Sequence, residues 1–474
     1  MQSENGGDFP AIFFFGGRLH HASIASMHSQ GSAMPVSLQR LPREPADRFT
    51  QAFARFLRIE AASGTLLLLC VALALGLTNS PWSAAYLAFW DTPIGIRWGN
   101  AELSHTIKHW LNDGAMTLFF FVVALELKRE TVLGELRDPR TTAFAMAAAL
   151  GGMLVPALLF VVLDGSTTPR GWGIAMATDT AFVIGCLALL GSRIPRSLRL
   201  FLLSLAIFDD IGAILVIAIG YGGALHWDSL GYAAAGLIAV AGFGWMGVRA
   251  VAAYIAIGVF IWLSLSESGI HPTLTGVLLG FMTPARSWVS DNRLHAILGK
   301  VMAYPAGAHW SGDTQDRRDL QRAGIAAREA ISPLERIELS LHPWVAFLVL
   351  PLFALANAGF PLALGEVDWR LTAAIVAGLS LGKPLGIVLF SFVAARLKLG
   401  IRPDGLSWPL IAGGATLAGI GFTMAILIAE LALSPDRLGS AKLGILTASL
   451  LSAISGVSLL LWLTSARRGS SEDT

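Results

Sequence analysis

The sequence predicts an all-α polytopic membrane protein with about twelve transmembrane helices. Of its 474 residues, 54% are hydrophobic and only 14% are charged, whereas a soluble protein carries about 25% charged residues. The mean hydropathy of +0.63 reflects many apolar runs that approach the roughly 20 residues needed to cross a bilayer. Lysine and arginine also alternate between rich and poor connecting segments, as they do in membrane proteins.

The apolar runs predict twelve spans. They cover residues 60–79, 106–128, 142–163, 172–190, 198–221, 229–246, 250–265, 269–283, 335–358, 371–395, 409–431 and 440–464. The seventh and eighth spans come from one long apolar region that the segment SESG (266–269) divides.

The basic residues predict the orientation of these spans. With both termini in the cytoplasm, 27 lysines and arginines fall on the cytoplasmic side and six on the outer side, and Lys383 is left inside a span. This bias follows the positive-inside rule. We therefore expect a disordered cytoplasmic extension at 1–58, a transmembrane domain at 59–464 and a cytoplasmic tail at 465–474.

Two segments between spans have patterns of their own. Residues 94–103 alternate apolar and polar side chains around a Gly-Asn pair, which predicts a short external hairpin. Residues 284–334 form a long cytoplasmic loop, part of which has helical spacing and predicts an amphipathic helix that is either solvated or bound to a lipid surface. Its expected face consists of Leu320, Ala323, Ala327 and Ile331.

Four ionisable residues fall deep inside predicted spans. Asp179 lies in span four, Asp209 and Asp210 lie together in span five, and Lys383 lies in span ten. A charge at the centre of a bilayer costs about 2.5–3.5 kcal/mol on insertion scales. A structural aspartate–lysine ion pair is the simpler interpretation of Asp179 and Lys383, but the adjacent aspartates favour a functional interpretation.

The two adjacent aspartates suggest ion chemistry. Successive helix residues point about 100° apart, so one carboxylate can face a neighbouring span while the other faces a cavity. A partly desolvated carboxylate can hold either a proton or a hard cation such as Na⁺ or Li⁺. Competition for one site couples the movement of the two ions, and hydroxyls at Thr178 and Ser204 can add oxygen ligands.

Two spans are expected to be discontinuous. AMATDTAF (175–182) in span four and GGATLAGIGFTMA (413–425) in span eleven are rich in glycine, threonine and small residues. Span four is the middle of the triplet 3–5, and span eleven is the middle of the triplet 10–12. Because four spans separate the two triplets, the triplets enter the membrane from opposite sides, as an inverted repeat requires. Asp179 and Lys383 can offset the partial charges of the broken helix ends. Close helix packing through small residues is the alternative explanation for span eleven.

Seven motifs in the same order along the chain resemble those of bacterial NhaA-type sodium/proton antiporters. They are NDGAMTLFFFVVALELKRE (112–130), ATDTAF (177–182), FDDIGAILVIA (208–218), GIHPTLTGVLLGF (269–281), LHPWVAFLVLPLFALANAG (341–359), LGKPLGI (381–387) and AGIGFTMAIL (418–427). The resemblance covers about 60–460 and implies twelve spans in inverted repeats, with two broken helices that cross.

The resemblance also implies roles for the intramembrane residues. Asp210 would be the principal cation carboxylate, and Asp209 would pair with Lys383 when no cation is bound. Thr178 and Asp179 would lie at the crossing of the broken helices.

The activity implied is electrogenic exchange of internal Na⁺ or Li⁺ for external H⁺, activated at alkaline pH, by a secondary transporter rather than an enzyme. A bacterial inner membrane, a homodimer formed through the 94–103 hairpin, no cofactor beyond the transported ions and no nucleic-acid partner are expected with it.

The family resemblance places a pH-sensing region at Glu126, Glu338 and His342. Simpler explanations exist, because Glu126 can pair with Lys128 or Arg129 at a helix end and His342 can serve in packing before Pro343. Some relatives carry a histidine where this chain has Leu339, so its pH profile is expected to differ.

Three other functions deserve comparison. An intramembrane aspartic protease needs Tyr-Asp and Gly-x-Gly-Asp motifs, and this sequence has neither. A symporter of organic anions needs cationic groups in its cavity, where only Lys383 is available. A passive channel does not need a lysine facing the acids.

Overall fold

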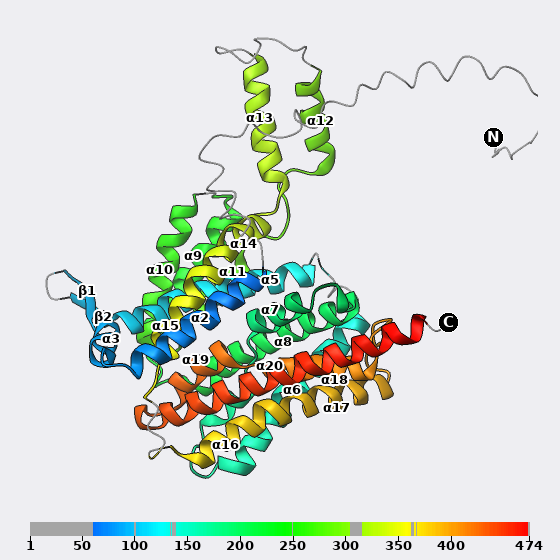
Figure 1. The fold of residues 1–474 in the computed structure, drawn as a ribbon. Coiled ribbons are helices and arrows are strands. Elements are labelled where there is room, and N and C mark those ends of the chain that lie inside the picture. Colours follow the sequence, from blue (N-terminus) through cyan, green and yellow to red (C-terminus); the bar gives the residue numbers. More distant parts are fainter. Residues whose placement is uncertain are drawn as a thin grey trace, which may run out of the picture. The chain divides into compact units, whose positions relative to one another are not determined.

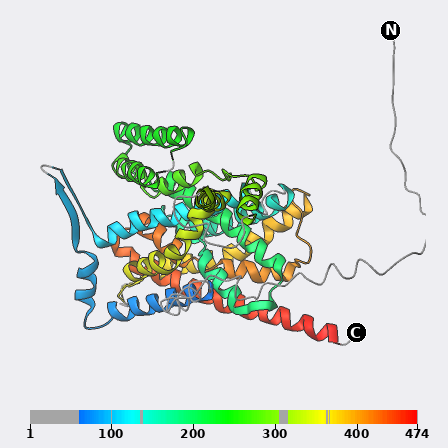
Figure 2. The same ribbon diagram turned by 90° about the horizontal axis from the view of Figure 1, so that it is seen from above.

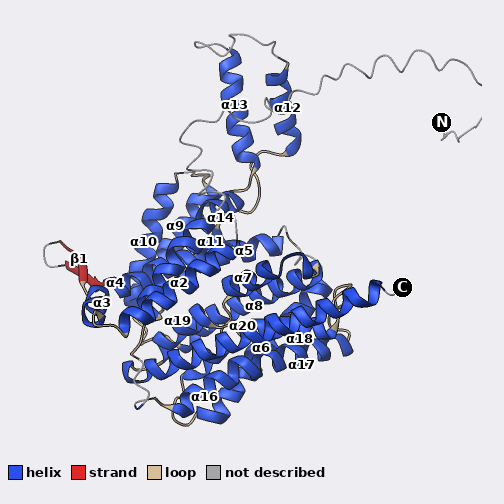
Figure 3. Cartoon of the chain, viewed as in Figure 1, coloured by secondary structure: helices blue, strands red, loops and turns tan. Residues whose placement is uncertain are grey.

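The computed structural model describes residues 60–472, except 99–100, 133, 135–138, 249, 304–314, 362–364 and 366. The predicted extension at 1–58 lies outside the described residues. Regular structure in the described part is almost entirely helical, apart from one pair of strands (Figure 3).

The first half of the chain forms nine helices and two strands within the described ranges. They are α2 (Glu60–Thr78), α3 (Ser83–Trp90), β1 (Pro93–Trp98), β2 (Ala101–Thr106), α4 (Ile107–Trp110), α5 (Met116–Val132), α6 (Pro139–Asp164), α7 (Thr180–Leu190), α8 (Arg196–Gly220), α9 (Trp227–Trp245) and α10 (Val251–Ser268). A π-helical turn (Leu111–Ala115) joins α4 to α5, and a 3₁₀ helix (Gly171–Met176) precedes α7.

The second half continues with helices only in its described part. They are α11 (Leu274–Met282), α12 (Asp291–Met302), α13 (Gln315–Ala330), α14 (Pro333–Trp344), α15 (Leu350–Asn357), α16 (Trp369–Ala377), α17 (Lys383–Arg396), α18 (Trp408–Ala418), α19 (Phe422–Ala432) and α20 (Pro435–Glu472). π-Helical turns join α14 to α15 (Val345–Val349) and α16 to α17 (Gly378–Gly382).

Eight helical segments of the described chain are long and apolar enough to cross a membrane, and the number rises to ten if two bent pairs each count as one span. The bent pairs are α2 with α3, at 118°, and α18 with α19, at 47°. The predicted class, a helical protein with many membrane spans, agrees with this architecture. The predicted span at 269–283 contains only the nine-residue α11, so length and composition do not by themselves establish twelve spans.

The membrane helices pack as two groups (Figures 1 and 2). We call α2, α4, α5, α9–α11, α14 and α15 the hairpin group, because it carries the two strands. We call α6–α8 and α16–α20 the core group, because it carries the four intramembrane charges predicted from the sequence. Within the core group α6 packs along α17, and α20 packs along α16 and α18; α2 packs against α7 and joins the groups.

The strands β1 and β2 form an antiparallel hairpin between α3 and α4. Their register pairs Pro93 with Thr106 and Trp98 with Ala101. The indole of Trp110 in α4 donates a hydrogen bond to the Ile94 carbonyl, at 2.8 Å, which fixes the base of the hairpin. In Figure 2 the hairpin extends at the left, away from the helices. We call this end of the bundle the hairpin end.

The segment 284–334 contains two helices, α12 and α13, which pack against each other (Figure 1). The predicted helix is present, but its buried residues are Ala323 and Ala326. Of the expected face, Ala323 is buried, whereas Leu320 and Ile331 are exposed, so the buried positions of α13 are small alanine side chains. Ser332 and Glu335 form a capping box that starts α14.

Candidate functional site

Helix α8 carries the two adjacent aspartates, and both are buried. Burial of its apolar residues holds α8 as one continuous helix through this position, although Phe208, Asp209 and Gly212 have low helix propensity. Because consecutive side chains diverge by about 100°, the two carboxylates meet different neighbours. Asp209 contacts Thr178 and Lys383, whereas Asp210 accepts a hydrogen bond from the Thr180 hydroxyl at 3.3 Å.

Asp209 and Lys383 form an ion pair that is closed to solvent. The Lys383 ammonium lies 3.1 Å from Asp209 Oδ2, and their side chains are 0% and 1% exposed. Thr178 donates to the same Oδ2 at 2.5 Å, and the other oxygen, Oδ1, is buried without a hydrogen-bond partner in the described part. A buried charge pair of this kind is tolerated because each group neutralises the other.

Lys383 also joins the ion pair to a broken helix. Its ammonium donates a hydrogen bond to the carbonyl of Met176, the last residue of the 3₁₀ helix before α7. A helix end with free carbonyls carries a partial negative charge, which a cation offsets. Lys383 therefore pairs with Asp209, not with Asp179, and compensates one broken end at the same time.

Asp179 lies between the positive ends of two helices. It is the N-cap of α7, where its Oδ1 accepts from the Phe182 N–H at 3.1 Å. Its Oδ2 accepts from both the backbone N–H and the hydroxyl of Thr423 in the first turn of α19, at 3.0 and 2.5 Å. One carboxylate thus satisfies amide donors at the start of two helices, which is favourable for a negative charge.

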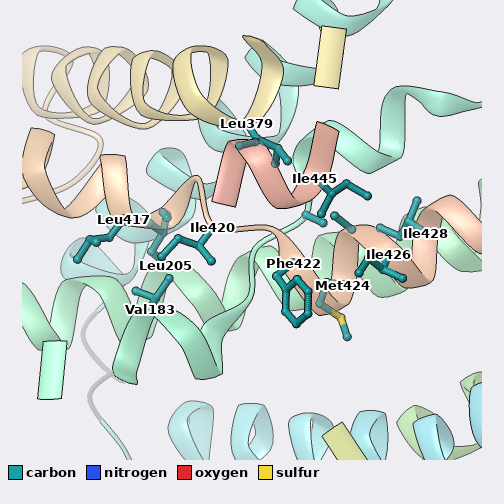
Figure 4. Packing of buried hydrophobic residues seen from close by; sticks show 14 of the residues in the cluster. Val183, Leu205, Leu379, Leu417, Ile420, Phe422, Met424, Ile426, Ile428 and Ile445 are labelled. Carbon is teal, nitrogen blue, oxygen red and sulfur yellow. The ribbon is translucent and has the colours of Figure 1, made fainter. Parts of the chain in front are cut away.

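The two interrupted segments, 177–179 and 419–421, are in direct contact. The Asp179 N–H donates to the Ile420 carbonyl at 2.7 Å. Gly419 is needed for close approach, because a Cβ there would lie 2.6 Å from the Leu379 carbonyl oxygen. Figure 4 shows the break enclosed by buried apolar side chains, which keep its backbone away from lipid as irregular structure at membrane depth requires.

Asp210 forms no ion pair in the described structure, because Lys383, which interacts with it electrostatically, is paired with Asp209. Its contacts are to the Thr180 hydroxyl, and its neighbours Asp209, Asp179 and Glu126 are acidic. Oxygen atoms of this kind suit a proton or a hard cation. Ser204, the other predicted oxygen donor, instead lines a cleft of about 300 Å³ between α6 and α8 that neither aspartate lines.

Two of the predicted pH-sensing residues lie around one arginine. Arg129 at the end of α5 lies 2.5 Å from Glu338 of α14 and 2.9 Å from Glu130, and it interacts electrostatically with Glu126. Among the described residues, one oxygen of Glu338 is buried without a hydrogen-bond partner. Lys128 donates instead to the carbonyls of Phe281 and Thr283. His342 is exposed.

Sequence reasoning missed two hydroxyl groups of this site, Thr180 and Thr423. Thr180 lies two residues after Thr178 in the same motif, so its position was a usable signal. Thr423 lies 244 residues from the carboxylate that it contacts, and only a three-dimensional fold brings them together.

Comparison with known proteins identifies relatives over most of the chain. The family described as "Na+/H+ antiporter 1" matches residues 54–460. The chain is 59% identical to the "Na(+)/H(+) antiporter NhaA" of Rhizobium meliloti, over 92% of this chain and all of that protein. It is 54% identical to "Na(+)/H(+) antiporter NhaA 2" of Acidiphilium cryptum and 48% identical to "Na(+)/H(+) antiporter NhaA 2" of Vibrio vulnificus, each over 89% of this chain and 94% of the relative.

Proposed function

The chain belongs to the Na⁺/H⁺ antiporter 1 family, and we propose that it exports Na⁺ or Li⁺ in exchange for a larger number of protons. Membership makes it a multi-pass membrane transporter rather than an enzyme. The observation that carries the finer proposal is the pair of buried aspartates, of which Asp209 forms an ion pair with Lys383 and Asp210 forms none in the described structure.

The proposed exchange is a competition at Asp210. In the cation-free state Asp210 holds a proton and Asp209 is paired with Lys383. An arriving Na⁺ takes the Asp210 oxygens, and the proton leaves to the same side. If the cation also binds the Asp209 carboxylate, Lys383 loses its ion-pair partner and releases a second proton. Two protons then move against one Na⁺, so each cycle transfers one net charge and draws on the membrane potential.

The second part of the proposal is that spans four and eleven are discontinuous helices that cross at the ion site. The hydrogen bond between the breaks, and the placement of Asp179 at two positive ends and Lys383 at a negative end, support a crossed arrangement of spans four and eleven. That arrangement fits twelve spans with inverted repeats over spans 3–5 and 10–12, both termini cytoplasmic and the hairpin end outside, as the distribution of basic residues predicts.

Regulation by alkaline pH is proposed for Glu126, Glu338 and His342. The grouping of two of these acids around Arg129 supports it, since deprotonation there changes the charge between α5 and α14. We expect Glu338→Gln to displace the pH range of exchange, and Ser340→Ala, on the same helix, to leave it unchanged. An unaltered pH profile of Glu338→Gln would remove Glu338 from this role.

The transport proposal is tested with purified protein in sealed liposomes that hold a proton gradient and a pH dye. Addition of Na⁺ or Li⁺ should collapse the gradient, and K⁺ should not. Asp210→Asn should abolish the response, while Asp228→Asn, an exposed aspartate in the first turn of α9, should retain it. A folded native protein that responds to neither Na⁺ nor Li⁺ between pH 6.5 and 9 would contradict the proposal.

A further inference from the structure

Three charged side chains meet at the hairpin end, away from the ion site. The Lys108 ammonium in α4 lies 3.0 Å and 3.1 Å from the two carboxylate oxygens of Glu430 in α19. The Lys442 ammonium in α20 lies 2.8 Å from one of the same oxygens. We call these residues the hairpin-end ion cluster. The proposed exchange at Asp210 makes no use of it.

The two lysines come from different helix groups. Lys108 precedes α5 in the hairpin group, whereas Glu430 and Lys442 lie on α19 and α20, which pack together in the core group. The Lys108–Glu430 pair therefore connects the two groups, and the Lys442–Glu430 pair lies within one of them. Glu430 is two helical turns beyond Thr423, the residue that holds Asp179, so α19 links the cluster to the ion site.

The three charged groups differ in burial, and the difference favours release of Lys108 from Glu430. The side chains of Lys442 and Glu430 are 6% and 13% exposed, and that of Lys108 is 27% exposed. A buried carboxylate that loses all of its partners is strongly destabilised. Glu430 keeps Lys442 when Lys108 leaves, and Lys108 is the cation best placed to be hydrated. The bridging pair can part without leaving a buried charge uncompensated.

We infer that the Lys108–Glu430 pair is a releasable ion pair that holds the two helix groups together at the hairpin end while the ion site is closed to that side. An exchanger exposes its site to one side at a time through relative movement of helix bundles, so the pair must part once in every cycle. This inference rests on the proposed exchange function, and it adds a specific contact that controls access from the hairpin end.

The direct test is a reversible cross-link. Lys108→Cys/Glu430→Cys is prepared with Cys70 and Cys186 replaced by serine, and it is treated in liposomes with a short bifunctional thiol reagent that a reductant cleaves. Na⁺/H⁺ exchange should fall at least tenfold and return after reduction. The matched control, Glu430→Cys/Lys442→Cys with the same reagent, joins residues of one group and should keep its rate within twofold.

An undiminished rate of Na⁺/H⁺ exchange with the 108–430 cross-link complete would overturn the inference, because the two helix groups would then not need to separate at the hairpin end. Equal loss in both cross-linked pairs would also overturn it, because the effect would not depend on joining the groups. Each rate is compared with that of the same variant before cross-linking. A native chain that exchanges no cation contradicts the proposed function instead.

A second measurement does not depend on transport or on cross-linking. Amide hydrogen exchange is compared between purified Lys108→Met, Lys442→Met and the native chain. Lys108→Met should raise exchange about fivefold in α4 and the adjoining turn (107–115) and leave the contact of α19 with α20 protected, whereas Lys442→Met should loosen α19 and α20. Protection of 107–115 that is unchanged in Lys108→Met would show that the pair does not hold the groups together.

Discussion

Lys383 and Asp209 neutralise each other in a place that water does not reach. The sequence alone predicted that one lysine and three acids lie inside the membrane. It did not choose between Asp179 and Asp209 as the partner of Lys383, because that choice depends on how spans four, five and ten pack. The resemblance to antiporters suggested Asp209, and the structure places the ammonium beside that residue.

Replacement of Lys383 should lower the stability of the protein, because it leaves a buried charge without a partner. Lys383→Met leaves Asp209 without its cation, so the free energy of unfolding should fall by about 3–5 kcal/mol. Lys383→Met/Asp209→Asn removes both charges and should recover most of this loss. Thermal unfolding in detergent measures both variants. A double variant no more stable than Lys383→Met would argue against mutual neutralisation.

The hydroxyl of Thr423 supplies one of the donors that hold Asp179. Thr423→Val keeps the shape of the side chain but removes that donor, which should lower the free energy of unfolding by about 1–2 kcal/mol. Thr423→Ser retains the donor and should stay closer to the native value. Chemical unfolding followed by tryptophan fluorescence distinguishes the two, and equal losses would mean that the hydroxyl contributes little.

At the scale of the elements, the interruptions in spans four and eleven were predictable because glycine and threonine are concentrated there. Their fine structure was not. The stretch before Asp179 is a 3₁₀ helix rather than an α-helix, and α13 buries alanines rather than its larger apolar residues. Both outcomes follow from tertiary packing, which overrides the local pattern.

Two glycines provide a test of the close contact at the second break. Gly419→Ala puts a Cβ 2.6 Å from the Leu379 carbonyl oxygen, and it should destabilise the protein by about 1–3 kcal/mol through overpacking. A Cβ at Gly439 in α20 meets no atom of the described residues within 4 Å, so Gly439→Ala should be neutral or stabilising by about 0.5–1 kcal/mol. Thermal unfolding of both variants under one condition is the measurement. Similar effects of the two alanines would contradict a packing requirement at Gly419.

At the scale of the whole molecule, hydropathy and charge predicted a helical membrane protein and a consistent orientation. Span number was harder to fix, because α11 has only nine residues and α2 bends sharply into α3. Such short and bent segments are stabilised by neighbouring helices, so a count of apolar residues in one sequence does not determine them.

The family resemblance implies that the hairpin joins two copies of the chain, and we propose this homodimer for the present protein. Replacement of residues 94–105 by a short Gly-Ser linker should convert a dimer to a monomer in detergent, as measured by light scattering, while exchange in liposomes persists. A shortened protein that remains dimeric would show that the dimer interface lies outside the hairpin.

The central claim is that protons and Na⁺ compete for Asp210. It is tested most directly by adding Na⁺ to the purified protein in weak buffer and recording proton release together with the affinity for Na⁺ at several pH values. The account predicts that Na⁺ binding releases protons, that the affinity weakens as the pH falls, and that Asp210→Asn abolishes both effects. Na⁺ binding to the folded native chain without proton release, at an affinity independent of pH, would contradict it.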